Sequence, residues 1–244
     1  MADTIPSRTR HVRTRLHSEE HVPGGVSVRD VILGVSDGLT VPFALAAGLS
    51  GAVTSNFIVF IAGVAEMLAG GIAMGLGGYL SEKSHAEIYR KELERENREV
   101  DEVPELERRE VRDIWKARGY AGAELDQLVD AIIKDRRRWV EFMMREELGL
   151  LEPRASGAYK TSLTIGMSYI VGALVPLFPF LIPLTIHQAL LLSSVTTLSA
   201  LFLVGVFKSR FTGAAWWRSG LETTLIGAAA AGAAYVLVRL LSHG

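Results

Sequence analysis

Five apolar segments constrain this chain more than any other feature, because each is long enough to cross the hydrocarbon core of a membrane. A membrane-spanning helix needs about 20 mostly apolar residues. The segments cover residues 31–53, 57–80, 161–183, 189–207 and 221–238. The stretch 161–207 contains no Asp, Glu, Lys or Arg. We therefore expect an all-α integral membrane protein with five transmembrane helices.

Charged residues are concentrated between the second and third apolar segments, where twenty of the 27 acidic residues lie between Glu82 and Glu152. This region is expected to be a cytoplasmic helical domain, with helices starting at Pro104 and covering 123–133 and 136–148. The second membrane helix is expected to continue straight to Pro104, because no helix breaker precedes it. The predicted division is a basic disordered tail (1–28), transmembrane helices 1 and 2 (29–83), the helical domain (84–157) and transmembrane helices 3 to 5 (158–244).

The distribution of basic residues predicts the orientation in the membrane. The tail carries Arg8, Arg10, Arg13 and Arg15 without the apolar core of a signal peptide, whereas the connections 54–56 and 184–188 contain no Lys or Arg. Because basic connections stay in the cytoplasm, the N-terminus is expected there and the C-terminus on the far side. The membrane would be the plasma membrane in a prokaryote and the vacuolar membrane in a eukaryote.

Several classes of protein are disfavoured by composition. A net charge of −1 argues against nucleic acid as a partner, and the absence of cysteine removes disulfides and thiolate metal sites. No glycine-rich phosphate loop or nucleophile elbow is present, so we do not expect an enzyme or a bound cofactor. Of the six scattered histidines, only His85 lies near the acids, and it is expected to be a surface residue.

Two acidic residues interrupt the first two apolar segments. Asp37 and Glu66 each place an ionisable group inside hydrocarbon, which costs at least about 2.5–3.5 kcal/mol. Met74 lies at a depth similar to that of Asp37, at about 1.5 Å per helical residue, and Glu66 lies deeper. These three side chains are predicted to line a cation pathway. The structural alternatives are a packing hydrogen bond for Asp37 and a buried, protonated acid for Glu66.

A second group of acids lies in the charged region. Glu96 and Glu99 share one helical face, Glu107 and Glu110 share another, and Pro104 between the pairs allows the two helices to fold together. Further along, Met143, Met144 and Glu147 bring thioethers and a carboxylate onto one helix. Mixed oxygen and sulfur ligands suit divalent transition metals. The alternatives are a solvated charged face for the acids and core packing for the methionines.

Three motifs resemble the vacuolar iron transporter family, whose members also occur in bacteria. They are RDVILGVSDGLTVPF (residues 29–43), MGLGGYL (74–80) and FMM followed by ELG (142–144 and 147–149). The resemblance implies a homodimer of five-helix subunits that exchanges ferrous iron, and often other divalent metals, for protons. It implies translocation through Asp37, Glu66 and Met74. It also implies metal collection in the cytoplasmic domain by Glu96, Glu99, Glu107, Glu110, Met143, Met144 and Glu147.

We therefore expect a transporter that exports ferrous iron from the cytoplasm in exchange for protons, with manganese, cobalt and zinc as further substrates. The partners expected are metal ions, protons, the lipid bilayer and a second copy of the chain. The competing interpretation is a membrane-anchored metal sensor or scaffold, which would bind metal without transporting it.

Overall fold

The computed structural model describes residues 25–153 and 157–243, and every regular element in these ranges is helical. The prediction of a disordered basic tail falls almost entirely on residues outside these ranges. The elements are α1 (Gly25–Ser50), α2 (Asn56–Glu102), α3 (Pro104–Ala117), α4 (Gly122–Ile133), α5 (Arg136–Phe142), the π-helix η1 (Met143–Glu147), α6 (Gly157–Leu177), the 3-10 helix η2 (Phe178–Leu181), α7 (Ile186–Thr212) and α8 (Trp216–His243).

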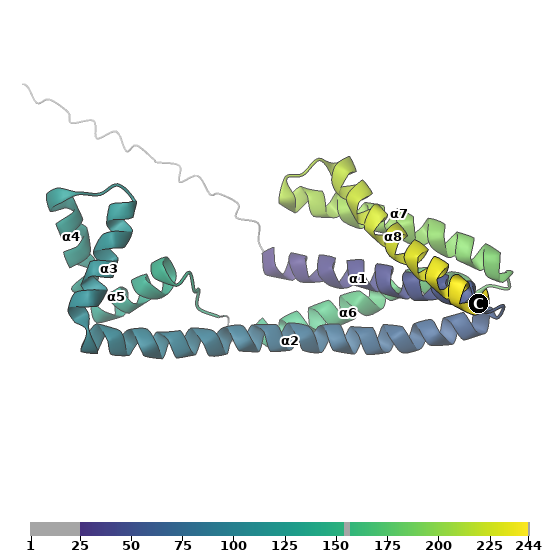
Figure 1. Cartoon of the computed structure of the whole chain (residues 1–244), viewed down its shortest axis with the longest axis horizontal. Coiled ribbons are helices and arrows are strands. Elements are labelled where there is room, and N and C mark those ends of the chain that lie inside the picture. The colour runs from purple at the N-terminus through teal and green to yellow at the C-terminus, as the bar shows by residue number, and fades with distance from the viewer. Residues whose placement is uncertain (1–24, 154–156, 244) are drawn as a thin grey trace, which may run out of the picture.

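Five of the described helices are long and apolar enough to cross a membrane, which confirms the predicted fold class at this level. They are α1, the apolar part of α2, α6, α7 and α8, and together they form what we call the membrane bundle (Figure 1). In this bundle α6 packs against both α1 and α2, while α8 packs against α1 and α7. Large apolar side chains such as Phe57, Ile72 and Leu203 remain exposed on its outside, as expected for a surface that faces lipid.

The segment boundaries differ from the predicted ones at several ends. The first helix ends at Ser50, and α7 continues to Thr212, so only residues 213–215 separate α7 from α8. Lys208, Arg210 and Arg218 therefore lie on helices. Gly213 closes α7 with φ +69°, a left-handed conformation that glycine adopts without steric penalty.

The proline-rich end of α6 departs from a regular helix. Pro176 lies in the last turn, α6 stops at Leu177, and a 3-10 helix follows. The Ser193 hydroxyl of α7 donates a hydrogen bond of 2.8 Å to the Pro176 carbonyl oxygen. This bond satisfies a buried acceptor where the helix loses its regular pattern.

Helix α2 runs without a break from the membrane bundle into a second region, as the lack of a helix breaker before Pro104 predicts (Figure 1). Its 47 residues correspond to about 70 Å, more than twice the roughly 30 Å of membrane hydrocarbon. The part of α2 from Glu82 onward, with α3, α4, α5 and η1, forms what we call the helical unit. Val103, which precedes Pro104, leaves the helical conformation and allows α3 to turn back.

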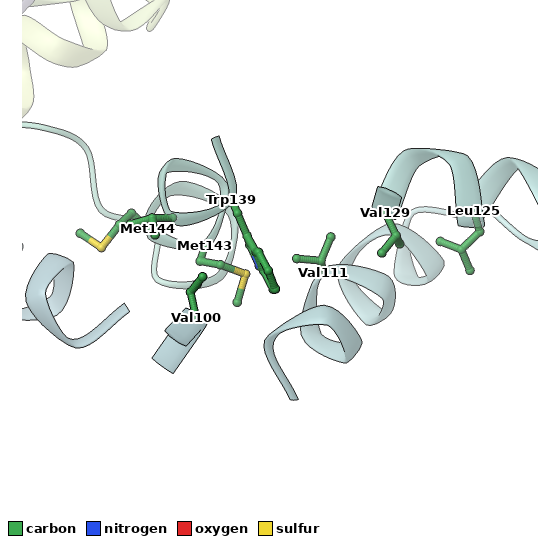
Figure 2. Packing of buried hydrophobic residues seen from close by; sticks show 8 residues of the cluster. Val100, Val111, Leu125, Val129, Trp139, Met143 and Met144 are labelled. Carbon is green, nitrogen blue, oxygen red and sulfur yellow. The ribbon is translucent and has the colours of Figure 1, made fainter. Parts of the chain in front are cut away.

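The helical unit has a hydrophobic core of its own. Val100 of α2, Val111 of α3, Leu125 and Val129 of α4, and Trp139 of α5 are buried together with both methionines of η1 (Figure 2). On its surface, Arg108–Asp130 and Arg112–Asp126 ion pairs join α3 to α4 at 2.8 and 2.6 Å. The packing fixes three acid-bearing elements relative to one another. The cytoplasmic location of this unit stays a prediction.

Candidate functional site

Three carboxylates converge inside the helical unit. Glu96 of α2, Glu107 of α3 and Glu147 of η1 each offer an oxygen atom, and these atoms lie within 4.8 Å of one another. Glu96 is 1% exposed and Glu107 is 2% exposed, whereas Glu147 is exposed at the edge of the group. The turn at Pro104 brings α2 and α3 together, and the core beneath them brings η1 to the same place. We call these three residues the carboxylate cluster.

The carboxylate cluster lacks the hydrogen bonds that its burial requires. Oε2 of Glu96 and Oε2 of Glu107 are buried with no hydrogen-bond partner among the described residues. A buried ionised carboxylate without a partner is costly, so it either takes up a proton or binds a cation. The arrangement can therefore hold protons or a divalent metal ion.

Burial and mutual repulsion favour the protonated forms of these acids. Desolvation, followed by the charges of Glu110 and Glu96, raises the pKa of Glu107 from 4.5 to about 7. Desolvation, followed by the charge of Glu147, raises the pKa of Glu96 to about 7. The pKa of Glu147 is also raised, mainly by desolvation. Near neutral pH the cluster is therefore poised between proton binding and ionisation.

Two further predicted ligands lie at the edge of this cluster. Glu110 is half-buried and close enough to raise the pKa values of both Glu107 and Glu147. The Glu99 carboxylate accepts two hydrogen bonds from Nε of Arg95, each 3.1 Å long. Glu99 thus has a cationic partner of its own, unlike the three central acids.

The two methionines are packed in the hydrophobic core. Met143 is fully buried and lies between Val100 and Trp139, whereas Met144 extends in another direction from η1 (Figure 2). This packing agrees with the alternative interpretation of Met143 and Met144 as core residues. Their role as metal ligands stays a prediction.

The element that carries Glu147 is a π-helix, where the sequence predicted a regular helix over 136–148. The Leu148 amide donates to the Met143 carbonyl oxygen, five residues back, at 3.2 Å. Gly149 then ends the turn with φ +65°. Single π-helical turns are frequent at functional sites because they change which side chains face a given side. No residue pattern in this segment predicted the change.

In the membrane bundle, Glu66 accepts a hydrogen bond from the hydroxyl of Tyr169 on α6. Gly70 of α2 leaves the space that the Tyr169 hydroxyl occupies, and a side chain at Gly38 of α1 would collide with the Tyr169 backbone. Tyr169 therefore connects α2 to the segment of α1 that carries Asp37. Sequence reasoning missed Tyr169, because a tyrosine in an apolar segment carries no signal of its partner.

Asp37 faces a different part of the bundle. With Arg29 of α1 and Lys208 of α7 it lines a cavity of about 700 Å³ between α1, α7 and α8, which we call the Asp37 cavity. Hydroxyl groups of Thr40 and Thr223 also lie along it. The structure thus brings the basic residue Lys208 of α7 to the cavity that Asp37 of α1 lines.

Met74 is half-buried on α2, one residue before Gly75, which packs closely against Ser162 of α6. The described residues that line the Asp37 cavity come from α1, α7 and α8, so Met74 is not among them. The exposed His85 lies on the charged part of α2. A shared pathway for Asp37, Glu66 and Met74 stays a prediction.

The model of the VIT family matches residues 28–239, which include every candidate residue described above. The chain belongs to the VIT family. Relatives within it extend over nearly the same length. Vacuolar iron transporter 1 of Arabidopsis thaliana is 47% identical over 227 residues, 93% of this chain and 91% of the relative. Vacuolar iron transporter 1 of Oryza sativa subsp. japonica is 46% identical over 98% of this chain and 93% of the relative.

More distant VIT relatives include Protein CCC1 of Saccharomyces cerevisiae, which is 36% identical over 88% of this chain and 69% of the relative. The VIT family is one of transporters and not of enzymes, which confirms the expectation that this chain is not an enzyme.

Proposed function

We propose that this protein exports ferrous iron across a membrane in exchange for protons, with manganese, cobalt and zinc as further substrates. The observation that carries the proposal is the carboxylate cluster, in which two buried oxygen atoms lack any hydrogen-bond partner. The names of its relatives support iron as the metal. The competing function is that of a metal sensor, which would use the cluster but not the membrane acids.

In this proposal the carboxylate cluster collects the metal. At neutral pH Glu96 and Glu107 would each be partly protonated, because their pKa values are raised to about 7. A divalent ion favours the ionised forms and displaces these protons. Oxygen ligands suit Fe²⁺ and Mn²⁺, and Met143 or Met144 would add sulfur ligands only after moving from the core.

Translocation is assigned to Asp37, Glu66 and Met74. The Asp37 cavity lies in the half of the bundle nearest the helical unit, because Arg29 is close to the start of α1 and Lys208 is close to the end of α7. Metal delivered by the carboxylate cluster would therefore meet Asp37 first. Glu66, bound to Tyr169, would follow as a deeper station. Each acid would hold metal and protons in turn, so that proton flow drives metal export.

The proposed orientation places the N-terminus and the helical unit in the cytoplasm and the C-terminus on the opposite side. An odd number of spanning helices supports termini on opposite sides, and the basic residues support the direction. A homodimer is proposed from the family resemblance. The relatives' names support a vacuolar membrane in a eukaryote, and the corresponding membrane in a prokaryote would be the plasma membrane.

Reconstitution tests the proposal. Full-length protein in proteoliposomes should move Fe²⁺ when a pH gradient is imposed, with opposing proton movement reported by a trapped pH dye. Collapsing the gradient with a protonophore should stop net transport against the metal gradient. Metal binding without flux in the same preparation would favour the sensor and overturn the transporter.

A further inference from the structure

The two adjacent glutamates of η1 have different partners. Glu147 joins the carboxylate cluster, whereas Glu146 accepts a hydrogen bond from Nη2 of Arg118 at the end of α3. Arg145 also lies 3.2 Å from Glu146. Arg118 therefore binds the residue next to Glu147 and does not bind Glu147 itself.

Aromatic contacts reinforce the attachment of Arg118 to η1. The Arg118 guanidinium lies 5.1 Å from the ring centre of Trp115. Trp115 in turn stacks on Phe142, with ring centres 5.8 Å apart, and Phe142 directly precedes η1. Arg118 thus reaches η1 by an ion pair and through a stack of two rings. The more exposed ion pairs of α3, such as Arg112–Asp126, lead to α4 instead.

This connection matters because η1 is a short π-helical turn. It is five residues long and follows a seven-residue helix. In a π-helix, five-residue hydrogen bonds replace the usual four, so the direction of each side chain depends on keeping that one wide turn. If η1 reverted to a regular helical turn, Glu146 and Glu147 would both rotate around the axis.

We infer that Arg118 is a positioning residue for metal binding: its hold on Glu146 keeps η1 in the orientation in which Glu147 completes the carboxylate cluster. The inference rests on the proposed role of this cluster in binding metal. It goes beyond that role because Arg118 itself touches no metal ligand of the cluster.

Electrostatics and positioning predict opposite effects of removing Arg118. Loss of a nearby positive charge makes the surroundings of the cluster more negative, and it frees Glu146 as an additional carboxylate. Both changes would tighten the binding of a divalent cation. Positioning predicts weaker binding, because Glu147 no longer has a fixed place beside Glu96 and Glu107. Weaker metal binding after removal of Arg118 would therefore support positioning, whereas tighter binding would indicate a purely electrostatic effect.

The test uses full-length protein in lipid nanodiscs, titrated with Mn²⁺ alone by calorimetry. Arg118→Gln should weaken the Kd about three- to tenfold. Arg112→Gln is the matched control, because Arg112 lies on the same helix with similar exposure and pairs with Asp126 of α4. It should leave the Kd within about twofold of the wild-type value. Arg118→Lys, which keeps the charge, should restore part of the affinity.

A double-mutant cycle shows whether Arg118 acts through Glu147. In a Glu147→Gln background, Arg118→Gln should cause no further loss, whereas general unfolding of the unit would weaken binding in both backgrounds. Unchanged or tighter binding by Arg118→Gln alone would overturn the inference while leaving the metal site intact. Absence of Mn²⁺ binding in the wild type would overturn the metal site, and the inference with it.

Discussion

The acidic residues of the helical unit lie in different surroundings from those of the membrane bundle. In the helical unit, three carboxylates from three elements converge within 4.8 Å, and desolvation, followed by mutual repulsion, raises the pKa values of Glu96 and Glu107. In the bundle, Glu66 is bound to Tyr169, while Asp37 faces a separate cavity. A cluster can surround one ion with several ligands, whereas single acids offer one ligand at a time. From this difference we propose that the helical unit captures the metal ion and that the membrane bundle passes it across the membrane.

The largest expected effect is on capture. Changing Glu96 and Glu107 together to Gln should weaken the Kd for Mn²⁺ by at least about 100-fold, because each charged ligand is worth roughly 1.5–3 kcal/mol. Glu141→Gln is the control, because Glu141 lies on the exposed surface of the same unit and pairs with Arg137. It should change the Kd by less than about threefold. Equal losses in the two proteins would mean that the cluster is not the binding site.

The second-largest expected effect is that a lower pH weakens metal binding by the carboxylate cluster. Because the pKa values of Glu96 and Glu107 are about 7, metal binding near neutral pH must displace protons. The Kd should rise about tenfold per pH unit for each displaced proton between pH 7 and pH 6. Titrations at several pH values should show a shallower slope for Glu107→Gln than for the wild type. Parallel slopes would contradict proton displacement from Glu107.

A smaller effect is expected in the bundle from Tyr169→Phe, which removes the hydroxyl that donates to Glu66 but keeps the ring. Iron flux in proteoliposomes should fall about three- to tenfold, in keeping with the loss of one hydrogen bond to a charged group. Mn²⁺ binding by the helical unit should not change. If Tyr169→Phe weakened Mn²⁺ binding as much as it lowered iron flux, metal capture and metal passage could not be assigned to different regions.

The smallest effect concerns stability without metal. The pKa of Glu107 is raised to about 7, so the folded state binds more protons than the unfolded state between about pH 4.5 and 7, and stability falls as pH rises through this window. Glu107→Gln should therefore raise the apparent Tm by a few degrees at pH 8 and not at pH 5, as followed by circular dichroism with EDTA present. An equal shift at both pH values would contradict the charge effect.

The sequence predicted those features that depend on local pattern. Five apolar segments, the proline-rich end of α6 and the continuous α2 follow from hydropathy and from the positions of helix breakers. The spacing of the acids around Pro104 also placed Glu96 and Glu107 in one candidate site. The predictions of the helices succeed because neighbouring residues along the chain decide them, whereas metal binding by Glu96 and Glu107 stays a prediction.

Features that depend on distant partners were not predictable. Glu99 and Glu96 have the same chemistry, and only the placement of Arg95 and of α3 separates the paired acid from the buried one. The contact of Tyr169 with Glu66 joins residues 103 positions apart. The π-helical turn depends on how η1 fits against Trp115 and the core, which no local pattern records.

One paired measurement tests the central claim that capture and passage use different acids. Asp37→Asn and Glu107→Gln proteins are each assayed for Mn²⁺ binding in nanodiscs and for pH-driven iron flux in proteoliposomes. Asp37→Asn should abolish flux with an unchanged Kd, whereas Glu107→Gln should weaken the Kd yet approach wild-type flux at saturating iron. Full flux by Asp37→Asn protein would contradict the account.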